Sequence, residues 1–562
     1  MTATLSGTTA TGAFQGLWQR QLDHYPNTRK RIWYLAIVVL ATIMLYYELY
    51  VGGSVGPNII AHYGMTFRYY VYISVVGNAV GAFGSLLAGI TDRWGRANLT
   101  AYGLVLTALL TLFGVPNAGD KWTFSILVII IGLVEGVILV ATPALIRDFS
   151  PQLGRASAMG FWTLGPVMGS LVVAVVSTNT LSHLVAWQDQ YTICGIAGLV
   201  VGVIALFGLR ELSPRLRDQL MVSIRDRALI EAKARGLDVE ASLRNPWRQM
   251  MHLDVVGSAF AISVFLMIYY AAVGFFVIYF ESLYGYSPSK ANSIGNWFWA
   301  FDAGVLVIIG IISDKVRVRK PFMVVGAVGA IVMTIIFANL GKGTSYSTFV
   351  VVISVLAAFL AIAYAPWMAS FTETVEKHNP ALTATGLAVW GWIIRVVVAL
   401  SSLLVPVVIS SMTPLVTYGG QVSTLAAQYA PQLATAQAID PKTQATLNAN
   451  PADTTALTTA VGEIAKTFNV SPTAAQARLV ALAAVPKADL QFLNEHATEV
   501  TNASTAAPGQ WKTWWWVCVA CEALFIPFIF VMTGRWSPRK AKEDADAHER
   551  KVQEELAALQ EA

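Results

Sequence analysis

The first apolar run of the chain, residues 33–57, reads WYLAIVVLATIMLYYELYVGGSVGP. It contains a single charged side chain, that of Glu48. A helix needs about 20 largely apolar residues to cross the hydrocarbon core of a bilayer. This run meets that requirement, and it predicts a membrane-spanning helix near the start of the chain.

The composition of the whole chain agrees with this interpretation. Of its 562 residues, 55% are hydrophobic and 13% are charged, and the mean hydropathy is +0.56. Soluble globular proteins carry about 25% charged residues, because their surface faces water. The low charged fraction therefore indicates that much of the surface faces lipid. It argues against a soluble enzyme, a disulfide scaffold and a nucleic-acid-binding protein.

Eleven further apolar runs follow the first one. Together they predict an all-α integral membrane protein with twelve transmembrane helices. The twelve runs cover residues 33–57, 69–91, 98–116, 123–146, 156–178, 190–209, 255–280, 290–313, 321–340, 347–370, 383–411 and 514–533.

Basic residues are distributed unevenly between the runs. If the N-terminus is cytoplasmic, 28 of the 38 Lys and Arg fall in cytoplasmic segments and nine fall in outside segments. Loops rich in Lys and Arg stay on the cytoplasmic side of a membrane. We therefore expect a multi-pass protein of the cytoplasmic (inner or plasma) membrane, with both termini in the cytoplasm.

The runs and the polar segments between them predict seven regions. The first and last are a cytoplasmic N-terminal arm and a charged cytoplasmic tail. The regions are the arm 1–32, a six-helix half 33–209, a basic cytoplasmic connector 210–254, spans seven to eleven 255–411, an extracytoplasmic insert 412–510, span twelve 511–535 and the tail 536–562.

The insert 412–510 is polar and rich in Ala, Thr and Gln. Asp453 before TTALTTAVGEIAK and Ser471-Pro472 before TAAQARLVALAAV predict N-capped helices, the second with Pro at its first helical position. Two interpretations remain open. The insert is either a small helical cap or partly ordered loop, or it recruits a substrate or an extracytoplasmic partner.

Four short stretches recur in the same order in the second half of the chain. Two six-helix halves related by an axis along the membrane normal are a transporter architecture, with substrate bound between them near the midplane. The recurring pairs are Tyr46-Tyr47-Glu48 with Tyr269-Tyr270-Ala271, Thr91-Asp92-Arg93 with Ser313-Asp314-Lys315, Ala158-Met159-Gly160 with Ala384-Thr385-Gly386, and Ser213-Pro214-Arg215 with Ser537-Pro538-Arg539.

The loop after the second run carries a more specific signal. It reads Gly89-Ile90-Thr91-Asp92-Arg93-Trp94-Gly95-Arg96 and resembles the G-x-x-x-D-R-x-G-R signature of the major facilitator superfamily. The second half repeats the G-x-x-x-D spacing from Gly310 to Asp314-Lys315. The resemblance implies a twelve-helix fold in two pseudo-symmetric halves. It also implies a gating role for Asp92, Arg93, Gly95, Arg96, Asp314 and Lys315.

Further motifs resemble subgroups of this superfamily. Glu48-Leu49-x-x-x-Gly53-x-x-x-Pro57 is similar to a motif of aromatic-acid:proton symporters. The stretch from Pro143 through Asp148 to Arg155 resembles one shared by sugar porters and metabolite:proton symporters, which adds Asp148 and Arg155 to the expected gate. By contrast, Gly165-Pro166-x-x-Gly169 is similar to a motif of drug antiporters.

Five ionisable residues lie well inside the runs: Glu48, Glu135, Asp302, Arg395 and Glu522. Such residues cost about 2.5–3.5 kcal/mol on insertion scales, so each one indicates function. A single Arg cannot pair closely with four acids, and desolvation favours a neutral carboxyl. We therefore expect Glu48, Asp302 and Glu135 to serve proton coupling and Arg395 to bind an anionic substrate. The alternative is a static ion pair, and Glu522 has no assigned role.

Aromatic residues crowd the same runs. They serve either helix packing or a substrate cavity, and a cavity with Arg, Tyr and Trp would suit an aromatic or amphipathic carboxylate. The candidates for substrate binding, beside Arg395, are Tyr47, Tyr270, Trp297, Tyr364, Trp367 and Trp390.

The leading interpretation is a secondary transporter that moves a small organic anion or metabolite by proton-coupled alternating access. The alternatives are a proton-driven efflux antiporter for drugs or lipophilic compounds, and a membrane sensor that uses 412–510. We expect no enzymatic activity, no cofactor beyond the proton gradient and no metal, because Cys518-x-x-Cys521 lacks a second ligand pair. The expected partners are a small-molecule substrate and the bilayer, with the monomer as the functional form.

Overall fold

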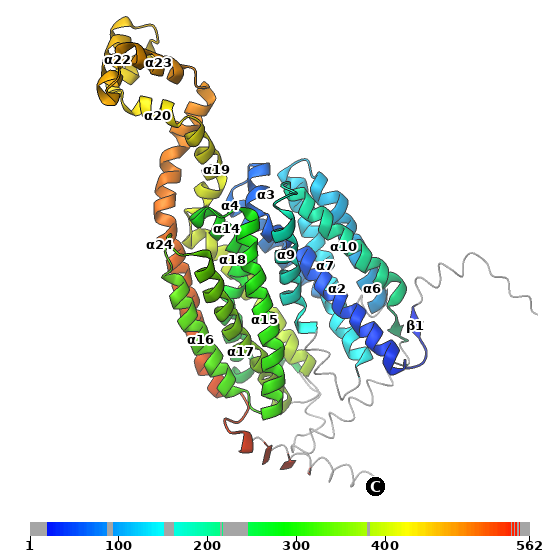
Figure 1. Cartoon of the computed structure of the whole chain (residues 1–562). Helices are drawn as coiled ribbons and strands as arrows, with labels where there is room; N and C mark the ends of the chain where they lie inside the picture. Colours follow the sequence, from blue (N-terminus) through cyan, green and yellow to red (C-terminus); the bar gives the residue numbers. More distant parts are fainter. Residues whose placement is uncertain are drawn as a thin grey trace, which may run out of the picture. The chain divides into compact units, whose positions relative to one another are not determined.

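The computed structural model describes two compact units. The bundle comprises Met1–Ile409 and Gly509–Ala562, and the insert unit comprises Ser410–Pro508 (Figure 1). The described residues are 20–86, 94–150, 162–213, 216, 246–378, 383–540, 542–543, 546–547 and 550.

The N-terminal half of the bundle consists of helices that match the first six runs. A two-residue parallel pair of strands, β1 (Gln21–Leu22) with β2 (Glu211–Leu212), holds the segment before the first helix against the segment after the last one. The helices are α2 (Thr28–Ser54), α3 (Gly56–Tyr63), α4 (Phe67–Leu86), α6 (Arg96–Leu109) with its continuations η1 (Leu110–Gly114) and η2 (Val115–Asn117), α7 (Lys121–Phe149), α9 (Gly165–Thr180) and α10 (Trp187–Gly208).

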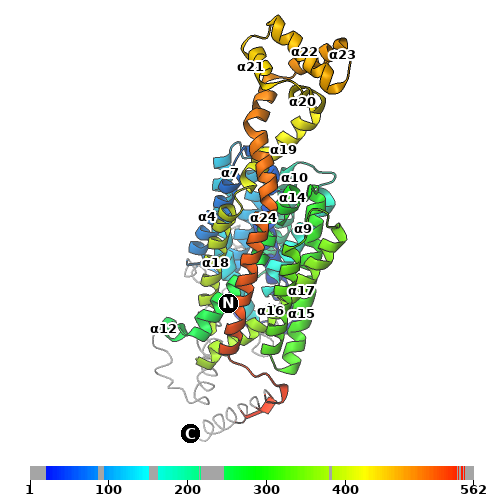
Figure 2. The same cartoon turned by 90° about the vertical axis from the view of Figure 1, so that its left-hand side faces the viewer.

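The C-terminal half of the bundle is also helical. Its last helix, α24, lies alongside α16 in both views (Figures 1 and 2), and a hydrogen bond joins them within the bundle. The elements are α12 (Pro246–Met250), η4 (Leu253–Gly257), α13 (Ser258–Phe265), α14 (Met267–Tyr284), α15 (Pro288–Val316), α16 (Lys320–Ala338), α17 (Tyr346–His378), α18 (Thr383–Val408) and α24 (Lys487–Val531).

The predicted fold class is confirmed. Ten helical segments in the described part of the chain are long and apolar enough to cross a membrane. The second and fifth runs correspond to α4 and α9; α9 is a shorter apolar helix of 16 residues. The first run breaks earlier than predicted, because Val55 leaves the helical conformation and Gly56-Pro57 begin α3.

The insert unit is helical and contains hydrophobic clusters of its own. One cluster is formed by Ile439, Ala460, Ile464 and Ala475. The predicted caps are confirmed: Asp453 accepts from the backbone N–H groups of Thr455 and Ala456, and Ser471 accepts from that of Ala474. Its helices are α19 (Met412–Gln428), α20 (Ala430–Gln437), α21 (Pro441–Ala449), α22 (Thr454–Phe468), α23 (Pro472–Ala483) and the first part of α24.

Glycines permit the closest helix contact in the N-terminal half. A Cβ on Gly81 of α4 would lie 2.8 Å from the carbonyl oxygen of Gly132 on α7, and a Cβ on Gly136 would overlap the carbonyl oxygen of Gly81. Helices in membranes associate through small residues that let their backbones approach, because lipid is as apolar as the helix surface. The α4–α7 pair therefore depends on the absence of side chains at these positions.

We predict that Gly136→Ala separates α4 from α7 and lowers the thermal unfolding midpoint of the purified protein. Gly304→Ala on α15 is the matched control, because nothing lies within 4 Å of the added Cβ. Alanine favours a helix over glycine by about 0.5–1 kcal/mol where it fits, so the control should keep or raise the midpoint. Equal midpoints for the two variants would contradict this account of the packing.

Candidate functional site

The two halves of the bundle meet through helices of both. α9 packs on α15, α4 on α18, and α2 on α14. A Cβ on Gly53 of α2 would lie 2.8 Å from the carbonyl oxygen of Val273 on α14, so these backbones almost touch. The closest approach lies near the end of α2, where Ser54 ends the helix.

Hydrogen bonds join the halves at the same end of the bundle, which we call the crevice end. Asn292 Nδ2 donates to the carbonyl oxygen of Ser54 at 3.0 Å. Ser289 Oγ donates to the carbonyl oxygen of Thr178 at 2.7 Å, and Asn296 Nδ2 donates to Thr178 Oγ1 at 3.1 Å. These bonds seal α2 and α9 of one half against α15 of the other.

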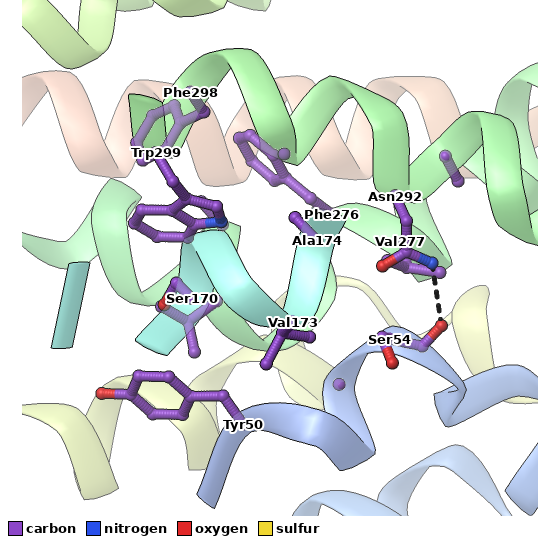
Figure 3. A pocket seen from close by; sticks show the side chains of 15 residues that line it. Tyr50, Ser54, Ser170, Val173, Ala174, Phe276, Val277, Asn292, Phe298 and Trp299 are labelled. Atoms are coloured by element: carbon purple, nitrogen blue, oxygen red, sulfur yellow. Dashed lines mark hydrogen bonds between the residues drawn. The ribbon is translucent and has the colours of Figure 1, made fainter. Parts of the chain in front are cut away.

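A narrow crevice lies beside this seal (Figure 3). Figure 3 shows Asn292 pointing to Ser54 across it. Ser170 Oγ is buried at its wall without a hydrogen-bond partner among the described residues. The lining residues are Tyr50, Gly53, Ser54, Ser170, Val173, Ala174, Ala272, Val273, Phe276, Val277, Ala291, Asn292, Gly295, Phe298 and Trp299.

Tyrosines and tryptophans from both halves gather next to the crevice. The ring of Tyr46 lies 5.5 Å from that of Tyr50, and the ring of Tyr269 lies 5.4 Å from that of Tyr270. The Tyr270 side chain of the C-terminal half lies near Tyr46 of the N-terminal half, so the cluster includes residues of both halves. We call the following residues the central cluster: Tyr46, Tyr50, Glu135, Tyr269, Tyr270, Asp302, Tyr364, Trp367, Trp390 and Arg395.

Arg395 of α18 is the cation of the central cluster. Its side chain is partly buried and lies within electrostatic range of Tyr46 on α2. Among the residues that the structure describes, none forms an ion pair or a hydrogen bond with its guanidinium. Arg395 therefore offers a planar donor fork whose hydrogen bonds remain to be made.

Two carboxyl groups of the central cluster come from opposite halves. Glu135 of α7 is 1% exposed, and neither of its carboxyl oxygens has a hydrogen-bond partner among the described residues. Asp302 of α15 is 3% exposed and lies near Tyr269 and Tyr364. An ionised carboxylate without a partner is costly away from water, so this arrangement favours the neutral form of both acids.

Two predicted residues of α2 face elsewhere. The carboxyl of Glu48 lies against Gly198 of α10 and close to Ala108 of α6, inside the N-terminal half. Tyr47 is buried near Cys194 of α10. An α-helix turns by about 100° per residue, so the face that carries Tyr46 points away from Glu48. The structure thus brings Tyr46 into the central cluster and turns Tyr47 and Glu48 toward α6 and α10, where Glu48 is near only Glu135 of that cluster.

Of the other aromatic residues predicted to bind substrate, some lie in the central cluster and Trp297 lies outside it. Trp297 is 48% exposed and shares an outward apolar stripe of α15 with Phe301 and Ile308, so it does not belong to the central cluster. Tyr364 and Trp390 lie at its centre, with ring centroids 6.4 Å apart. Trp367 is fully buried and stacks behind Tyr364.

Several predicted gate residues lie at the opposite end of the bundle, which we call the gate end. Asp92, Arg93 and Arg155 fall outside the described residues. Arg96 Nη1 donates to both carboxyl oxygens of Asp148 at 2.9 Å. The structure therefore joins the end of α7 to the start of α6.

Gly95 has a structural reason to be glycine. Its φ is +90°, and an added Cβ would overlap the carboxyl of Glu211. That carboxyl accepts from the backbone N–H of Arg96 at 2.6 Å and so caps α6. A carboxylate at a helix N-terminus is also favoured by the helix dipole. Glu211 is not among the residues predicted from the sequence, although it lies two residues before the recurring stretch Ser213-Pro214-Arg215.

The C-terminal half repeats the gate contact. Arg319 Nε donates to Glu373 at 3.1 Å, and its Nη1 forms an ion pair with Asp314 at 2.7 Å, whereas Lys315 is exposed. Arg319 and Glu373 follow Arg96 and Asp148 by 223 and 225 residues, which matches the spacing of the internal repeat. This second pair is not among the residues predicted above, although the repeat spacing applied to Arg96 and Asp148 points to both Arg319 and Glu373.

We predict that the Arg96–Asp148 contact stabilises the bundle. Their side chains are 17% and 6% exposed, and removing one partner of a buried pair typically costs about 3–5 kcal/mol. Thermal midpoints of Arg96→Gln, Asp148→Asn and the double variant should be non-additive, with the double variant close to either single one.

The control for this cycle is Arg539–Glu543, whose side chains are 90% and 63% exposed. Exposed pairs contribute little, so Arg539→Gln and Glu543→Gln should leave the midpoint unchanged. Additive losses for Arg96→Gln and Asp148→Asn would show that these residues act independently.

Comparisons with known proteins agree with this architecture. The family model of the Major Facilitator Superfamily matches residues 38–402. The efflux pump radE of Floropilus chiversii is 23% identical over 273 residues, which are 45% of this chain and 49% of the pump. Probable anion transporter 3 (chloroplastic) of Arabidopsis thaliana is 31% identical over 117 residues, which are 20% of this chain and 21% of the transporter. The chain thus spans about half or less of the length of these relatives.

The fold is also similar to a solved structure. A bacterial homolog of the human lysosomal transporter Spinster, in an inward-facing and occupied conformation, aligns with a TM-score of 0.55 and 16% identity, covering 90% of this chain and 97% of that one. The duplicated bundle, the gate motif and the family match over residues 38–402 lead to one conclusion: this chain belongs to the major facilitator superfamily of membrane transporters.

Proposed function

We propose that this protein is a secondary active transporter that moves a small organic anion across the cytoplasmic membrane by proton-coupled alternating access. The observation that carries the proposal is the guanidinium of Arg395, which lies near Tyr46 of the other half without forming an ion pair with any described residue. A substrate carboxylate would complete its hydrogen bonds, because guanidinium and carboxylate pair in a planar, bidentate way.

The surroundings of Arg395 favour a substrate with an apolar or aromatic body. Tyr46, Tyr270, Tyr364 and Trp390 supply ring faces and hydroxyl groups from both halves. Binding sites for small organic molecules combine such apolar walls with a few well-placed polar groups. Trp367 would support the wall by stacking on Tyr364 without touching the substrate.

Asp302 and Glu135 are the proposed proton carriers. Each is buried, and they lie on opposite halves. Each would hold its proton while the site is closed and release it when water or a cation reaches the carboxyl. The Tyr46 side chain lies near both Glu135 and Arg395. A change of charge at one of these two groups therefore alters the electrostatic environment of Tyr46 next to the other. Glu48 is left out of this role because its carboxyl, although near Glu135, lies between α6 and α10 inside the N-terminal half, away from Arg395 and Asp302.

Alternating access would proceed by rocking of the two halves around this site. The seal of Asn292, Ser289 and Asn296 against Ser54 and Thr178 closes the crevice end, and the Arg96–Asp148 and Arg319–Glu373 contacts would move with their own halves. Because one chain supplies the whole site, the monomer is the proposed functional form. The bilayer is its partner, and both termini would lie in the cytoplasm.

A second candidate function is proton-driven efflux of a lipophilic compound. It is supported by the matched efflux pump, by the aromatic walls and by Gly165-Pro166-x-x-Gly169 at the start of α9. In this case Asp302 or Glu135 would exchange a proton for the exported compound. Arg395 separates the two candidates, since an exported cation would gain nothing from a guanidinium.

We predict that Arg395→Lys lowers the affinity for the substrate by about 10- to 100-fold, because a charged hydrogen bond contributes about 1.5–3 kcal/mol and the lysine loses the planar fork. The measurement is binding of a panel of radiolabelled aromatic and aliphatic carboxylates to purified protein. Arg539→Lys is the control on the exposed tail. Unchanged affinity in Arg395→Lys, or preferential binding of cations, would favour efflux.

We further predict that Asp302→Asn and Glu135→Gln abolish accumulation driven by a pH gradient in proteoliposomes. Exchange of labelled for unlabelled substrate across the same membrane should persist, because it requires no net proton movement. If both variants still accumulate substrate in proportion to the imposed gradient, the coupling proton is carried elsewhere.

A further inference from the structure

Glu48 and Glu522 are the two buried acids that the proposed transport mechanism does not use. They are 5% and 0% exposed. Both oxygens of Glu48 and Oε2 of Glu522 lack a hydrogen-bond partner among the described residues. Neither residue forms an ion pair with a described Lys, Arg or His. Each acid therefore sits where an ionised carboxylate would be costly.

The surroundings of the two acids are alike. Glu48 lies between α6 and α10, near Thr107, Cys194 and Gly198. Glu522 of α24 accepts a hydrogen bond from Thr334 of α16 at 2.8 Å and lies near Cys518. In each half, a threonine of the third helix and a cysteine of the sixth helix face the carboxyl.

The internal repeat relates the two sites. The sixth helix reads Trp187-x-x-x-Tyr191-x-x-Cys194-x-x-x-Gly198, and the twelfth reads Trp511-x-x-x-Trp515-x-x-Cys518-x-x-x-Glu522. The same spacing of 324 residues separates Ser213-Pro214-Arg215 from Ser537-Pro538-Arg539. Both aromatic pairs are buried and in contact, with ring centroids 5.7 Å and 5.2 Å apart. Glu522 is therefore the counterpart of Gly198.

The first helices of the two halves also differ at the position of the acid. The spacing of 223 residues that pairs Tyr46 with Tyr269 pairs Glu48 with Ala271. Where the first helix carries the acid, the sixth carries glycine; where the first helix carries alanine, the sixth carries the acid. A Cβ on Gly198 would overlap the carboxyl of Glu48, so the Glu48 carboxyl already occupies the volume that a side chain at 198 would fill.

We propose that each half contains one equivalent proton-binding site at the junction of its first, third and sixth helices. Glu48 supplies the carboxyl from the first helix of the N-terminal half, and Glu522 supplies it from the sixth helix of the C-terminal half. The titratable groups that face Glu48 are Cys194 and Glu135, and those that face Glu522 are Cys518 and Cys521. Both carboxyls keep their proton through the transport cycle and hold the three helices together.

The test transfers the carboxyl between helices. Glu48→Ala and Gly198→Glu should each lower the thermal midpoint, the first by removing the carboxyl and the second by crowding it. The double variant should recover at least half of the loss, because it rebuilds in the N-terminal half the arrangement of Ala271 and Glu522. The reciprocal pair, Ala271→Glu with Glu522→Gly, should behave in the same way.

The matched control is Glu48→Ala with Gly202→Glu. Gly202 lies one turn further along α10, where an added Cβ meets Val105 in place of a carboxyl, so this pair should not recover stability. The proposed equivalence is overturned if neither double variant is more stable than the less stable of its two single variants. It is also overturned if the control with Gly202→Glu recovers as much stability as the double variant with Gly198→Glu.

Bound protons are measured separately. The infrared carbonyl band of a protonated carboxyl should lose intensity in Glu48→Gln and in Glu522→Gln, in protein held at pH 8 without substrate. An unchanged band would overturn the proposal for that acid. Both amide variants should also retain pH-driven accumulation of the carboxylate panel. If Glu48→Gln loses accumulation but keeps normal stability, Glu48 is a coupling residue and its proposed structural role is overturned. Failure of Asp302→Asn to uncouple transport would contradict the proposed function and would leave the stability and infrared results unchanged.

Discussion

The absence of water inside the bilayer is the constraint on which this structure depends. Backbone N–H and C=O groups that cannot bond to water must bond within the chain. A helix satisfies these groups within a single membrane-spanning segment. Polar side chains follow the same rule: Thr42 Oγ1 donates to the carbonyl oxygen of Val38, and Ser263 Oγ donates to that of Ala259. Among the described groups that break the rule, Arg395 and the two carboxyl oxygens of Glu135 lie in the central cluster, where a substrate or a proton can supply the partner.

Duplication accounts for the shared features of the halves, and departures from it account for the site. Arg96–Asp148 and Arg319–Glu373 repeat one contact at one end of both halves. In the central cluster the halves differ: the N-terminal half contributes Glu135, whereas the C-terminal half contributes Asp302 and Arg395. A symmetric framework can rock, but an asymmetric charge distribution is needed to couple the rocking to an anion and a proton.

Much of the fold could be predicted from the sequence, because hydropathy and capping are local properties. The positions of the spans and the caps at Asp453 and Ser471 follow from short stretches of sequence. The rotation of each helix about its axis does not. Lipid and protein interior are both apolar, so a spanning helix shows little difference between the face that meets lipid and the face that meets its neighbours. The sequence therefore predicts Tyr47 in the cavity, where the structure places Tyr46, and it predicts Trp297 there although that side chain is 48% exposed. The second gate pair was accessible from the repeat, since Arg319 and Glu373 stand at its spacing.

The charge of the closed site gives the proposed transport its mode of coupling and its stoichiometry. A closed site in low dielectric is least costly when its net charge is zero. With a monovalent anion on Arg395, neutrality requires Asp302 and Glu135 both to be protonated. Without the anion, neutrality requires one of them to release its proton and balance Arg395, a change that Tyr46 is placed to transmit from Glu135. The two closed states therefore differ by one anion and one proton together. On this argument the central cluster favours symport of an acid's anion with its proton. A bound cation would require Asp302 and Glu135 both to be ionised, which exchanges it for one proton, and repulsion between that cation and the Arg395 guanidinium disfavours this alternative.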